Sequence, residues 1–452
     1  MGGEWRQFKI GDLFDLKPGF AFKSSDFTDS GVPVIKIKNV KANVVVFDEL
    51  SYVDEEFLKK KKDYIVNYGD ILITMSGNRF DGSKETWVGK VAQFRAHEPY
   101  LLNQRVAILR PKQGAILDQR CCSYILGSSE YQDFFIAIAT SSGGQANLSP
   151  SQILGADVLL PPYEEQRAIA HILGTLDDKI ELNRRMNQTL EEMARALFKS
   201  WFVDFDPVRA KAAVRREHPD WSNAQVSRTA CPTLKPEIAE LFPDEFENSE
   251  LGEIPKGWRI GCVDDVFDLV LGQSPPGETY NEVGEGIPFY QGRADFTFRF
   301  PDRRVYCTAP TRFAKKGDTL ISVRAPVGAI NLAFEDCAIG RGVAAARHKT
   351  GAKSYTYYFM HGLAEVFNRF EAEGTVFGSI SKKDFHAIQC VIVPSQVVEA
   401  FERLCEPIDV RVEFAEIESR SLAALRDTLL PKLISGEIRV KDAEKFLKER
   451  GL

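Results

Sequence analysis

Side chains that could perform catalysis or hold a metal are scattered through this sequence of 452 residues. The six histidines and eight cysteines show no metal-ligand spacing, and no GxxxxGK[ST] loop for nucleoside triphosphates is present. Pro243-Asp244 and Pro301-Asp302 could begin the acidic motif of a nuclease, but no Glu-x-Lys follows either one closely. Gly284-Glu285-Gly286 lacks the flanking strand and helix of a dinucleotide loop. The sequence therefore favours binding over catalysis.

The tetrapeptide Leu160-Pro161-Pro162-Tyr163 resembles the loop with which amino-methyltransferases hold the amino group that they methylate. That loop has Asp or Asn at its first position, where a side chain must accept a hydrogen bond, and Leu160 cannot accept one. Two prolines that end a strand before a helix explain the tetrapeptide without catalysis. We therefore do not expect methyl transfer by this chain.

Composition and charge fit a globular protein, with 44% hydrophobic and 27% charged residues. The net charge of −6 argues against an indiscriminate polyanion binder, although a local basic face remains compatible with it. No apolar run is long enough to span a bilayer and no signal-peptide pattern is present, so we expect a cytoplasmic protein. One segment is strongly basic, either as a solvated face or as a nucleic-acid face: Arg293, Arg299, Arg303, Arg304, Arg312, Lys315 and Lys316, against Asp295 and Asp302.

Two long stretches, residues 163–205 and 395–436, have apolar residues at alternating intervals of three and four. Leu190 matches Leu422 and Leu197 matches Leu429, at a constant shift of 232. Such stripes are typical of helices that pack as a coiled coil, so we predict that the two stretches pair as antiparallel helices.

Five other positions refine this prediction. Asn183, Asn187 and Ser419 place polar groups near the stripes, and we expect them to fix the register of the pair. Gly174 and Pro407 occupy almost matching positions, and we expect each to break or kink its helix. A straight helix of about 28 residues, roughly 42 Å long, would then follow each break.

The helices end a longer internal repeat whose motifs keep their order in both copies. The shift between copies falls from about 255 to 232 along the chain, so the copies differ by insertions. Each copy combines short β-rich runs with helical spacings, which predicts a mixed α/β fold, α+β in its arrangement. The clearest pairs are Trp5-Arg6 with Trp258-Arg259, Gly69-Asp70-Ile71-Leu72 with Gly317-Asp318-Thr319-Leu320, and Leu148-Ser149 with Ile380-Ser381.

The repeat predicts a domain plan with two similar globular halves. We read the charged stretch between the copies, which carries five prolines, as an extended connector with one short helix at residues 235–242. The C-terminal tail is expected to form a short charged helix over residues 441–450. The predicted segments are 1–162 and 251–394 for the globular domains, 163–205 and 395–436 for the helices, 206–250 for the connector, and 437–452 for the tail.

This plan resembles the DNA-specificity subunit of type I restriction–modification enzymes over nearly the whole chain. The repeated Gly-Asp motifs carry the resemblance together with four further stretches: Ser142-Gly143-Gly144-Gln145 with Asn147-Leu148-Ser149, Leu159-Leu160-Pro161-Pro162 before Glu164-Glu165-Gln166, Leu197 to Phe205, and Glu250 to Pro255. The second copy departs from the family, with Gly374 to Ser381 where the family often has a more polar loop.

The resemblance implies a non-catalytic recognition subunit. Each globular half would be a target-recognition domain for one half of a bipartite double-stranded DNA target. The paired helices would separate these domains and dock two methyltransferase subunits, which restriction subunits join. The complex would act as a site-specific adenine methyltransferase and an ATP-dependent endonuclease, with AdoMet, ATP and Mg²⁺ on the partners and none of them on this chain.

Two sets of side chains follow from this resemblance. Arginine and lysine suit guanine, and asparagine and glutamine suit adenine, so we expect base contacts from polar residues on diverged loops. These are Lys36, Lys38, Asn39, Asn78, Arg79 and Gln145 in the first half, and Gln291, Arg293, Arg324 and Arg341 in the second. Outward-facing arginines of the helices are expected to contact the methyltransferase subunits: Arg184, Arg185, Arg195, Arg420 and Arg426.

Two other functions remain open at this point. A duplicated adaptor that recruits proteins without binding DNA would suit the acidic net charge. A self-sufficient methyltransferase or nuclease is disfavoured by the missing motifs. Salt-dependent binding to DNA would exclude the adaptor, because phosphate contacts weaken steeply as salt rises.

Overall fold

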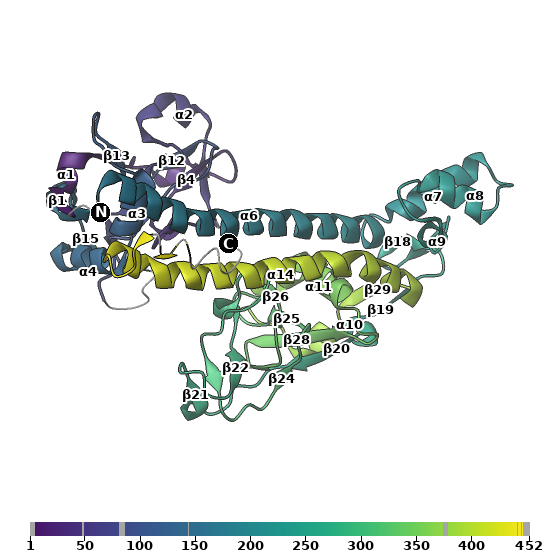
Figure 1. The fold of residues 1–452 in the computed structure, drawn as a ribbon. Coiled ribbons are helices and arrows are strands. Elements are labelled where there is room, and N and C mark those ends of the chain that lie inside the picture. The colour runs from purple at the N-terminus through teal and green to yellow at the C-terminus, as the bar shows by residue number, and fades with distance from the viewer. Residues whose placement is uncertain are drawn as a thin grey trace. The chain divides into compact units, whose positions relative to one another are not determined.

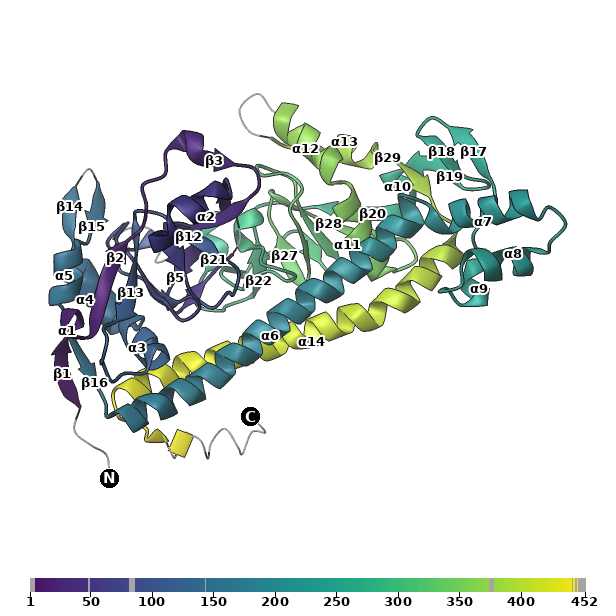
Figure 2. The ribbon, with the colours of Figure 1, turned by 90° about the horizontal axis from the view of Figure 1, so that it is seen from above.

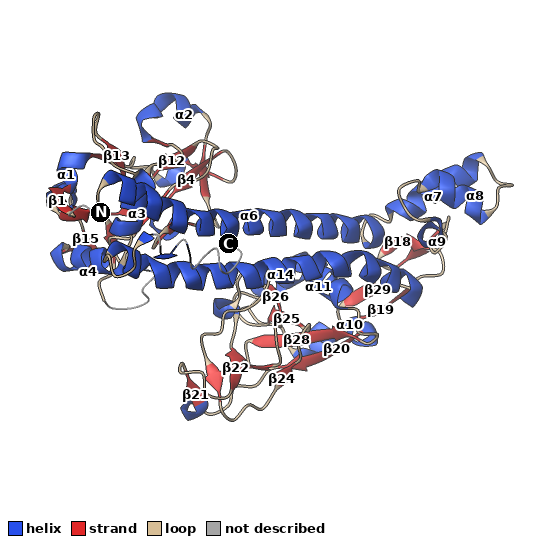
Figure 3. Cartoon of the chain, in the orientation of Figure 1, coloured by secondary structure: helices blue, strands red, loops and turns tan. Residues whose placement is uncertain are grey.

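The computed structural model describes residues 5–47, 49–80, 86–142, 144–373, 378–440, 442–443 and 445. The chain divides into two compact units, Met1–Asn183 with Ile417–Leu452 (unit 1) and Arg184–Glu416 (unit 2). Each unit contains one of the expected globular domains together with part of each long helix (Figure 1). Strands and helices mix within both domains, which confirms the predicted mixed α/β class (Figure 3).

The domain of unit 1 is built on two sheets and a strand pair. Strand β1 (Arg6–Lys9) runs antiparallel to β16 (Asp157–Leu160). A four-stranded sheet has the order β11-β9-β13-β2 and a five-stranded sheet the order β3-β7-β4-β12-β8. The strands of the first are β2 (Phe14–Pro18), β9 (Ile71–Thr74), β11 (Val91–Gln93) and β13 (Val106–Pro111). Those of the second are β3 (Phe27–Thr28), β4 (Val32–Ile35), β7 (Ser51–Val53), β8 (Ile65–Val66) and β12 (Tyr100–Leu102).

The domain of unit 2 repeats these two sheets and the strand pair. Its described strands include no counterpart of two smaller pairings in unit 1, which join residues 76–77 and 140–142 to 145–147, and residues 40–41 to 44–45. Strand β19 (Arg259–Cys262) pairs with β29 (Gln389–Ile392), and the sheets have the orders β20-β28-β25-β26 and β21-β23-β22-β27-β24. The first sheet contains β20 (Phe267–Leu271), β25 (Thr319–Ser322), β26 (Ile330–Leu332) and β28 (Val343–His348). The second contains β21 (Tyr280–Asn281), β22 (Ile287–Tyr290), β23 (Tyr306–Cys307), β24 (Phe313–Ala314) and β27 (Cys337–Ile339). The predicted duplication is confirmed by this match.

The repeated Gly-Asp motif has a structural explanation. Asp70 accepts two hydrogen bonds from the guanidinium of Arg110 on β13, with N–O distances of 2.9 and 2.6 Å. Asp318 accepts the same pair of bonds from Arg347 on β28, both at 2.7 Å. The preceding glycine lies in the left-handed region in both copies, with φ of 93° at Gly69. The motif therefore ties a tight turn to a neighbouring strand in each domain.

Each long helix is continuous over 40 residues, α6 over Tyr163–Phe202 and α14 over Ser395–Ile434, or about 60 Å. The predicted breaks at Gly174 and Pro407 were therefore wrong. Gly174 is accommodated because the Arg120 guanidinium occupies the space of a missing Cβ and donates to the Gly174 carbonyl at 2.8 Å. Pro407 costs α14 one backbone hydrogen bond, and the burial of Cys405 and other apolar neighbours on that helix outweighs this loss.

Within each unit the two helices pack antiparallel. In unit 1 the Asn183 amide donates to Glu418 at 2.7 Å and to Ser419 at 3.3 Å. In unit 2 the Asn187 amide donates to Glu416 at 2.8 Å. Asn183 and Asn187 are both buried, so the polar groups of one stripe meet polar groups of the other, as the register prediction requires.

The connector between the copies is folded, so its predicted extended structure was wrong. It forms α7 (Asp206–Glu217), α8 (Asn223–Ala230) and α9 (Pro236–Ala239), followed by a hairpin of β17 (Phe246–Ser249) and β18 (Gly252–Pro255) (Figure 2). Pro207 and Pro236 lie in the first turns of α7 and α9, where proline is tolerated. Buried Val208 and Phe242 join the hydrophobic core of unit 2, and the buried Lys211 ammonium donates to backbone carbonyls.

Two predicted features fall partly outside the described residues. Only 442–443 and 445 of the expected tail helix are described, and the divergent loop of the second copy lacks 374–377. Among the helices that the structure describes, none is long and apolar enough to cross a membrane.

Candidate nucleic-acid interface

Segments that are far apart in the sequence meet at one edge of each domain, four in unit 1 and three in unit 2, and we call each meeting place a polar edge. In unit 1 it comprises residues 35–39, 75–79, 103–105 and 145, and in unit 2 residues 290–293, 323–324 and 340–342. Asn103 N donates to the Ile35 carbonyl at 3.0 Å, and the matching bond from Gly340 to Tyr290 measures 2.8 Å. A second matching pair joins residue 75 to 105 at 2.8 Å and residue 323 to 342 at 2.9 Å. The backbone thus forms the same frame in both copies.

Two predicted lysines lie on the polar edge of unit 1. Lys36 is half-buried, and its ammonium donates to Ser51 Oγ at 2.8 Å and lies 3.7 Å from the centre of the Phe27 ring. Burial lowers the pKa of Lys36, and the charge of Lys38 lowers it further. Lys38 is exposed and pairs with Glu49 at 3.1 Å. Lys38 therefore offers its charge to solvent more directly than Lys36 does.

Asn39 does not lie on the surface as a base-reading residue must. It is 1% exposed, its Oδ1 accepts from Lys36 N at 3.0 Å, and its Nδ2 donates to the Val46 carbonyl at 3.2 Å. Asp295 makes the equivalent hydrogen bond in unit 2, where its carboxylate accepts from Gln291 N at 2.7 Å. Asn39 thus closes a turn that both copies share, and its assignment as a base contact is withdrawn.

Asn78 and Arg79 lie at the other end of this edge. The Asn78 amide donates to Thr86 Oγ1 at 2.9 Å and its side chain is half-buried. Arg79 is exposed and its guanidinium donates to the carbonyl of Ala139. Both remain predicted base contacts.

Gln145 lies on β15 (Gln145–Asn147), where its Oε1 accepts from Arg105 Nη1 at 2.8 Å. Arg105 and the adjacent Gln104 are both exposed, and neither was among the predicted residues. Gln104 occupies the position of Arg341 when the turns before β13 and β28 are matched, because β4 pairs with β12 as β22 pairs with β27. Aligning the middle of the repeat residue by residue would have found both.

In unit 2 all four predicted residues are exposed on the polar edge. Gln291 follows β22, Arg324 follows β25, and Arg341 lies in the turn before β28. The Arg293 guanidinium donates to the Phe296 carbonyl at 2.9 Å, so its side chain is partly held by its own loop. Three guanidinium groups and one amide are therefore exposed where unit 1 presents lysine, glutamine and two arginines, Arg79 and Arg105.

The basic segment at residues 293–316 does not form a single charged face. Arg299 is 1% exposed and lies inside unit 2. Arg303 pairs with Glu335 at 2.5 Å, and Lys316 pairs with Glu413 at 2.7 Å. The segment contributes one buried cation, two salt-bridged ones and four further exposed ones, so neither of the two sequence interpretations describes it as a whole.

Arg426 was predicted to face outward and does not. Its side chain is 17% exposed and bonds Asp177 at 2.8 Å, across the helix pair of unit 1. Burial of the long side chain against an acidic partner explains the position. Arg195 pairs with Glu191 at 2.5 Å, and its side chain is 48% exposed. The remaining arginines of that prediction are exposed or half-buried on the helices: Arg184, Arg185 and Arg420.

Exposed apolar residues on the helices were missed by the sequence analysis. Leu182 on α6 is 59% exposed and Phe414 on α14 is 61% exposed. The shift of 232 that relates the two helices also relates these two positions. Both lie outside the buried stripe, so they are not found by looking for apolar residues at alternating intervals of three and four.

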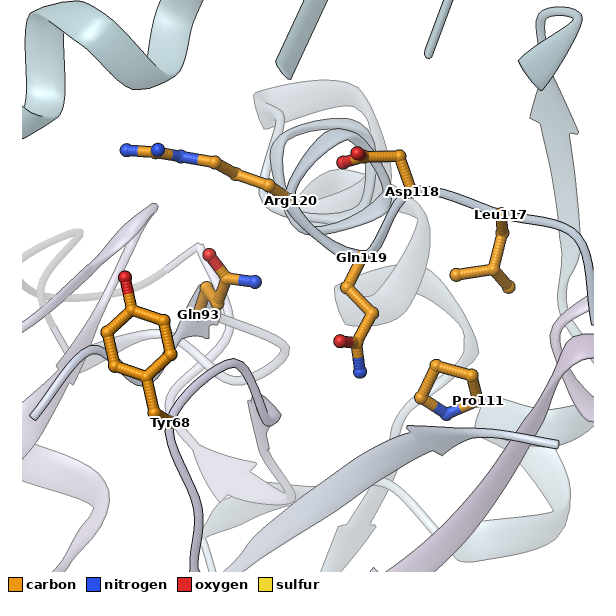
Figure 4. Close-up of a pocket in the computed structure, with 7 residues that line it drawn as sticks. All are labelled: Tyr68, Gln93, Pro111, Leu117, Asp118, Gln119 and Arg120. Carbon is orange, nitrogen blue, oxygen red and sulfur yellow. The ribbon is translucent and has the colours of Figure 1, made fainter. Parts of the chain in front are cut away.

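A pocket of about 440 Å³ lies elsewhere in unit 1 and contains no residue of the polar edge (Figure 4). Its lining residues are Tyr68, Gln93, Pro111, Leu117, Asp118, Gln119 and Arg120. The Tyr68 ring stacks on His97 at 4.6 Å, and Arg120 is held by Asp178. In the described part of the chain, no three His, Cys, Asp or Glu residues are grouped as a metal site.

Residues 2–192 match the family model described as the type I restriction modification DNA specificity domain. The chain is 27% identical to the putative type I restriction enzyme MjaX specificity subunit of Methanocaldococcus jannaschii, covering 97% of this chain and 94% of that protein. It is 24% identical to the type I restriction enzyme HindI specificity subunit of Haemophilus influenzae, covering 96% of this chain and all of that protein.

A fold match agrees with these relatives. The crystal structure of a type I restriction–modification system S subunit from M. genitalium matches with a TM-score of 0.53 and 17% identity, over 95% of this chain and 96% of that one. At this identity the match shows a shared fold. Together these findings show that residues 2–192 match the DNA specificity domain of type I restriction–modification systems, and that nearly the whole chain is similar to specificity subunits of type I restriction enzymes.

Proposed function

We propose that each globular domain reads one half of a bipartite DNA target through its polar edge. The observation that carries this proposal is the repetition of one backbone frame with different side chains on it. A shared frame presents each domain to a duplex in the same way, whereas diverged side chains select different bases. Arginine bonds guanine O6 and N7 in the major groove, and glutamine bonds adenine N6 and N7. The three arginines of unit 2 therefore favour guanine in the second half-site.

The net charge of −6 fits recognition that depends on base contacts more than on charge alone. Each helix of about 60 Å is also longer than one turn of B-DNA, roughly 34 Å, so two readers joined by such helices can be separated by a turn or more. These lengths support a target whose halves are separated by unread bases.

The paired helices are proposed to dock two methyltransferase subunits, which restriction subunits then join. Leu182 and Phe414 support this stoichiometry, because exposed apolar side chains at matching positions suit two copies of one partner. This chain itself binds no AdoMet, ATP or Mg²⁺ in the proposal, and those molecules are assigned to the partner subunits. The assembled complex would methylate adenine and cleave DNA with ATP.

The test is methylome sequencing of cells that carry the chain together with its methyltransferase subunit. A single two-part motif of modified adenines is expected, and it should vanish when this chain is deleted. DNA binding by the purified complex should also weaken steeply between 50 and 200 mM salt. A one-part motif would contradict two separate readers, and assembly of the complex without any salt-dependent DNA binding would favour the adaptor function instead.

Docking has its own test with matched variants. Leu182→Asp and Phe414→Asp each place a charge on one of the two duplicated positions, and each should remove one methyltransferase copy from the purified complex. Thr189→Asp, on an exposed position of α6 outside that pair, is the control. Two copies retained by both variants would remove these residues from the docking surface.

A further inference from the structure

Arg299 is the one fully buried arginine among the described residues of the basic segment, and its surroundings are unusual. It lies in the loop between the turn at Arg293–Asp295 and β23. Its guanidinium bonds Asp409 and lies 3.5 Å from Glu191. The flat face of the guanidinium stacks 3.7 Å from the centre of the Tyr357 ring. A buried arginine needs such partners, because an uncompensated charge in the interior is strongly unfavourable.

The partners of Arg299 come from three helices of unit 2. Glu191 lies on α6, Asp409 on α14, and Tyr357 on α11 (Lys353–Gly362). One side chain of the globular domain therefore reaches both members of the helix pair at once. A planar guanidinium can bond two acceptors only in a narrow range of orientations. A lysine ammonium has no such geometric requirement.

The neighbouring groups balance this charge. Arg195 pairs with Glu191 at 2.5 Å, and the hydroxyl of Tyr358 donates to Asp409 at 3.1 Å. His361 lies beside Arg195, and burial, followed by the charges of Arg195 and Arg299, lowers the pKa of His361 to about 3. The cluster therefore contains two cations, two carboxylates and a neutral histidine at neutral pH.

The loop that carries Arg299 also carries a predicted reader. Arg293 precedes it by six residues and is held by the Phe296 carbonyl at 2.9 Å. Leu332 N donates to the Arg299 carbonyl at 2.9 Å, and the Asn331 amide donates to the Thr297 carbonyl at 2.8 Å. The loop that joins Arg299 to Arg293 of the polar edge is thus tied to strand β26.

We propose that Arg299 is a positioning residue that sets the angle between the second recognition domain and its helix pair, and thereby restricts the spacer length of the DNA target. The inference rests on the proposed function, since spacer length has meaning only for a two-part target. Without the guanidinium bridge, the domain tilts on its helices and the polar edge meets half-sites at more than one separation.

Unit 1 offers a matched control. Arg95 and Arg120 both pair with Asp178, at the surface of α6, and Asp178 is 50% exposed. This contact involves only one of the two helices and lies at the surface, where an ion pair contributes little to stability and holds the domain only weakly in place. Asp178→Asn should therefore leave spacer selectivity unchanged.

The experiment uses the complex of the full chain with its methyltransferase subunits. It measures methylation of a DNA library in which both half-sites are constant and the spacer varies by single base pairs. The variant E191Q/R299M/D409N removes the bridging charges without leaving any of the three buried and unpaired. We expect unchanged half-site sequences and a fall of about tenfold in the preference for the wild-type spacer over its nearest neighbours, equivalent to ~1.4 kcal/mol.

Glu191→Gln is the milder second variant, since it keeps the bond to Asp409 and should show a smaller loss of the same preference. A two-part motif in the wild type with unchanged spacer preference in both folded variants overturns the inference. A purely structural role would lower the melting temperature and leave that preference intact, which also overturns it. Absence of a two-part motif in the wild type instead rejects the proposed function.

Discussion

In each unit the same kind of hydrogen bond attaches the globular domain to a long helix. In unit 1 the hydroxyl of Tyr124 donates to Asp177 on α6, and in unit 2 the hydroxyl of Tyr358 donates to Asp409 on α14, at 3.1 Å. The two aspartates are related by the same shift of 232 as the rest of the helices. A tyrosine on a domain helix and an aspartate on a long helix thus form the common anchor.

The source of the compensating cation differs between the units. Asp177 is paired with Arg426 of the other helix, whereas Asp409 is paired with Arg299 of the globular domain. At this position the helix pair of unit 1 therefore supplies its own cation, whereas that of unit 2 takes its cation from the domain. Duplicated domains can thus keep a fold while the electrostatic connection to the helices changes.

The largest expected effect follows from removing that cation. Arg299→Ala leaves Asp409 buried without a cation and Glu191 with Arg195 as its remaining cationic partner, and it should lower the free energy of unfolding of the chain by about 3–5 kcal/mol. Arg426→Ala in unit 1 is the matched variant, and its smaller effect is expected because Arg426 is partly exposed. Denaturant unfolding of the purified chain measures both. Equal losses from the two variants would contradict the contrast between the units.

A second prediction concerns the aspartate–arginine pair of the Gly-Asp motif, which both units have. Asp70→Ala and Asp318→Ala each remove a carboxylate that accepts two bonds from an arginine, and each should cost about 2–3 kcal/mol of stability. Because both aspartates are buried in the same turn, we expect the two losses to agree within about 1 kcal/mol. A clearly larger loss in one unit would show that the repeated motif has acquired different roles.

A third prediction is that each unit selects bases in its own half-site only. Arg324→Ala is expected to cost about 1–3 kcal/mol of discrimination at one base of the second half-site, and to leave the first half-site unchanged. Binding to targets with single substitutions in each half measures this. A uniform loss across all targets would instead assign Arg324 to a phosphate.

Acid should affect unit 2 more than unit 1 at one matched position. Burial lowers the pKa of His348 to about 4, while Pro111 occupies its place in unit 1. Because the pKa in the folded state lies below the unfolded value of about 6.5, stability is lost as pH falls from 6.5 towards 4. The loss at pH 5 should be ~1–2 kcal/mol. His348→Gln should flatten this part of the stability–pH curve, and an unchanged slope would contradict the assignment.

Sequence reasoning found the features that repeat and missed those that depend on distant partners. The duplication and the paired helices were predictable, because matched motifs and a three-four rhythm are local patterns. The continuity of α6 at Gly174 depends on Arg120, which lies 54 residues away in the sequence. The burial of Arg299 likewise depends on Glu191 and Asp409, so a basic run could not reveal it.

The folded connector shows a different reason for error. Its prolines indicated an extended chain, yet two of them occupy helix N-termini, where their fixed φ suits the first turn. For the base contacts, only Asn39 is now excluded, by its burial. The other nine remain predictions, because exposure permits a base contact without selecting it.

The most direct test of the central claim exchanges one domain. Residues 251–394 are replaced by the corresponding segment of a relative that modifies a different target, with Arg299 retained at its position, and the methylome of the resulting cells is sequenced. We predict that one half of the two-part motif changes to that of the donor, while the other half and the spacer stay the same. A change in both halves, or in neither, would contradict the account of two independent readers on shared helices.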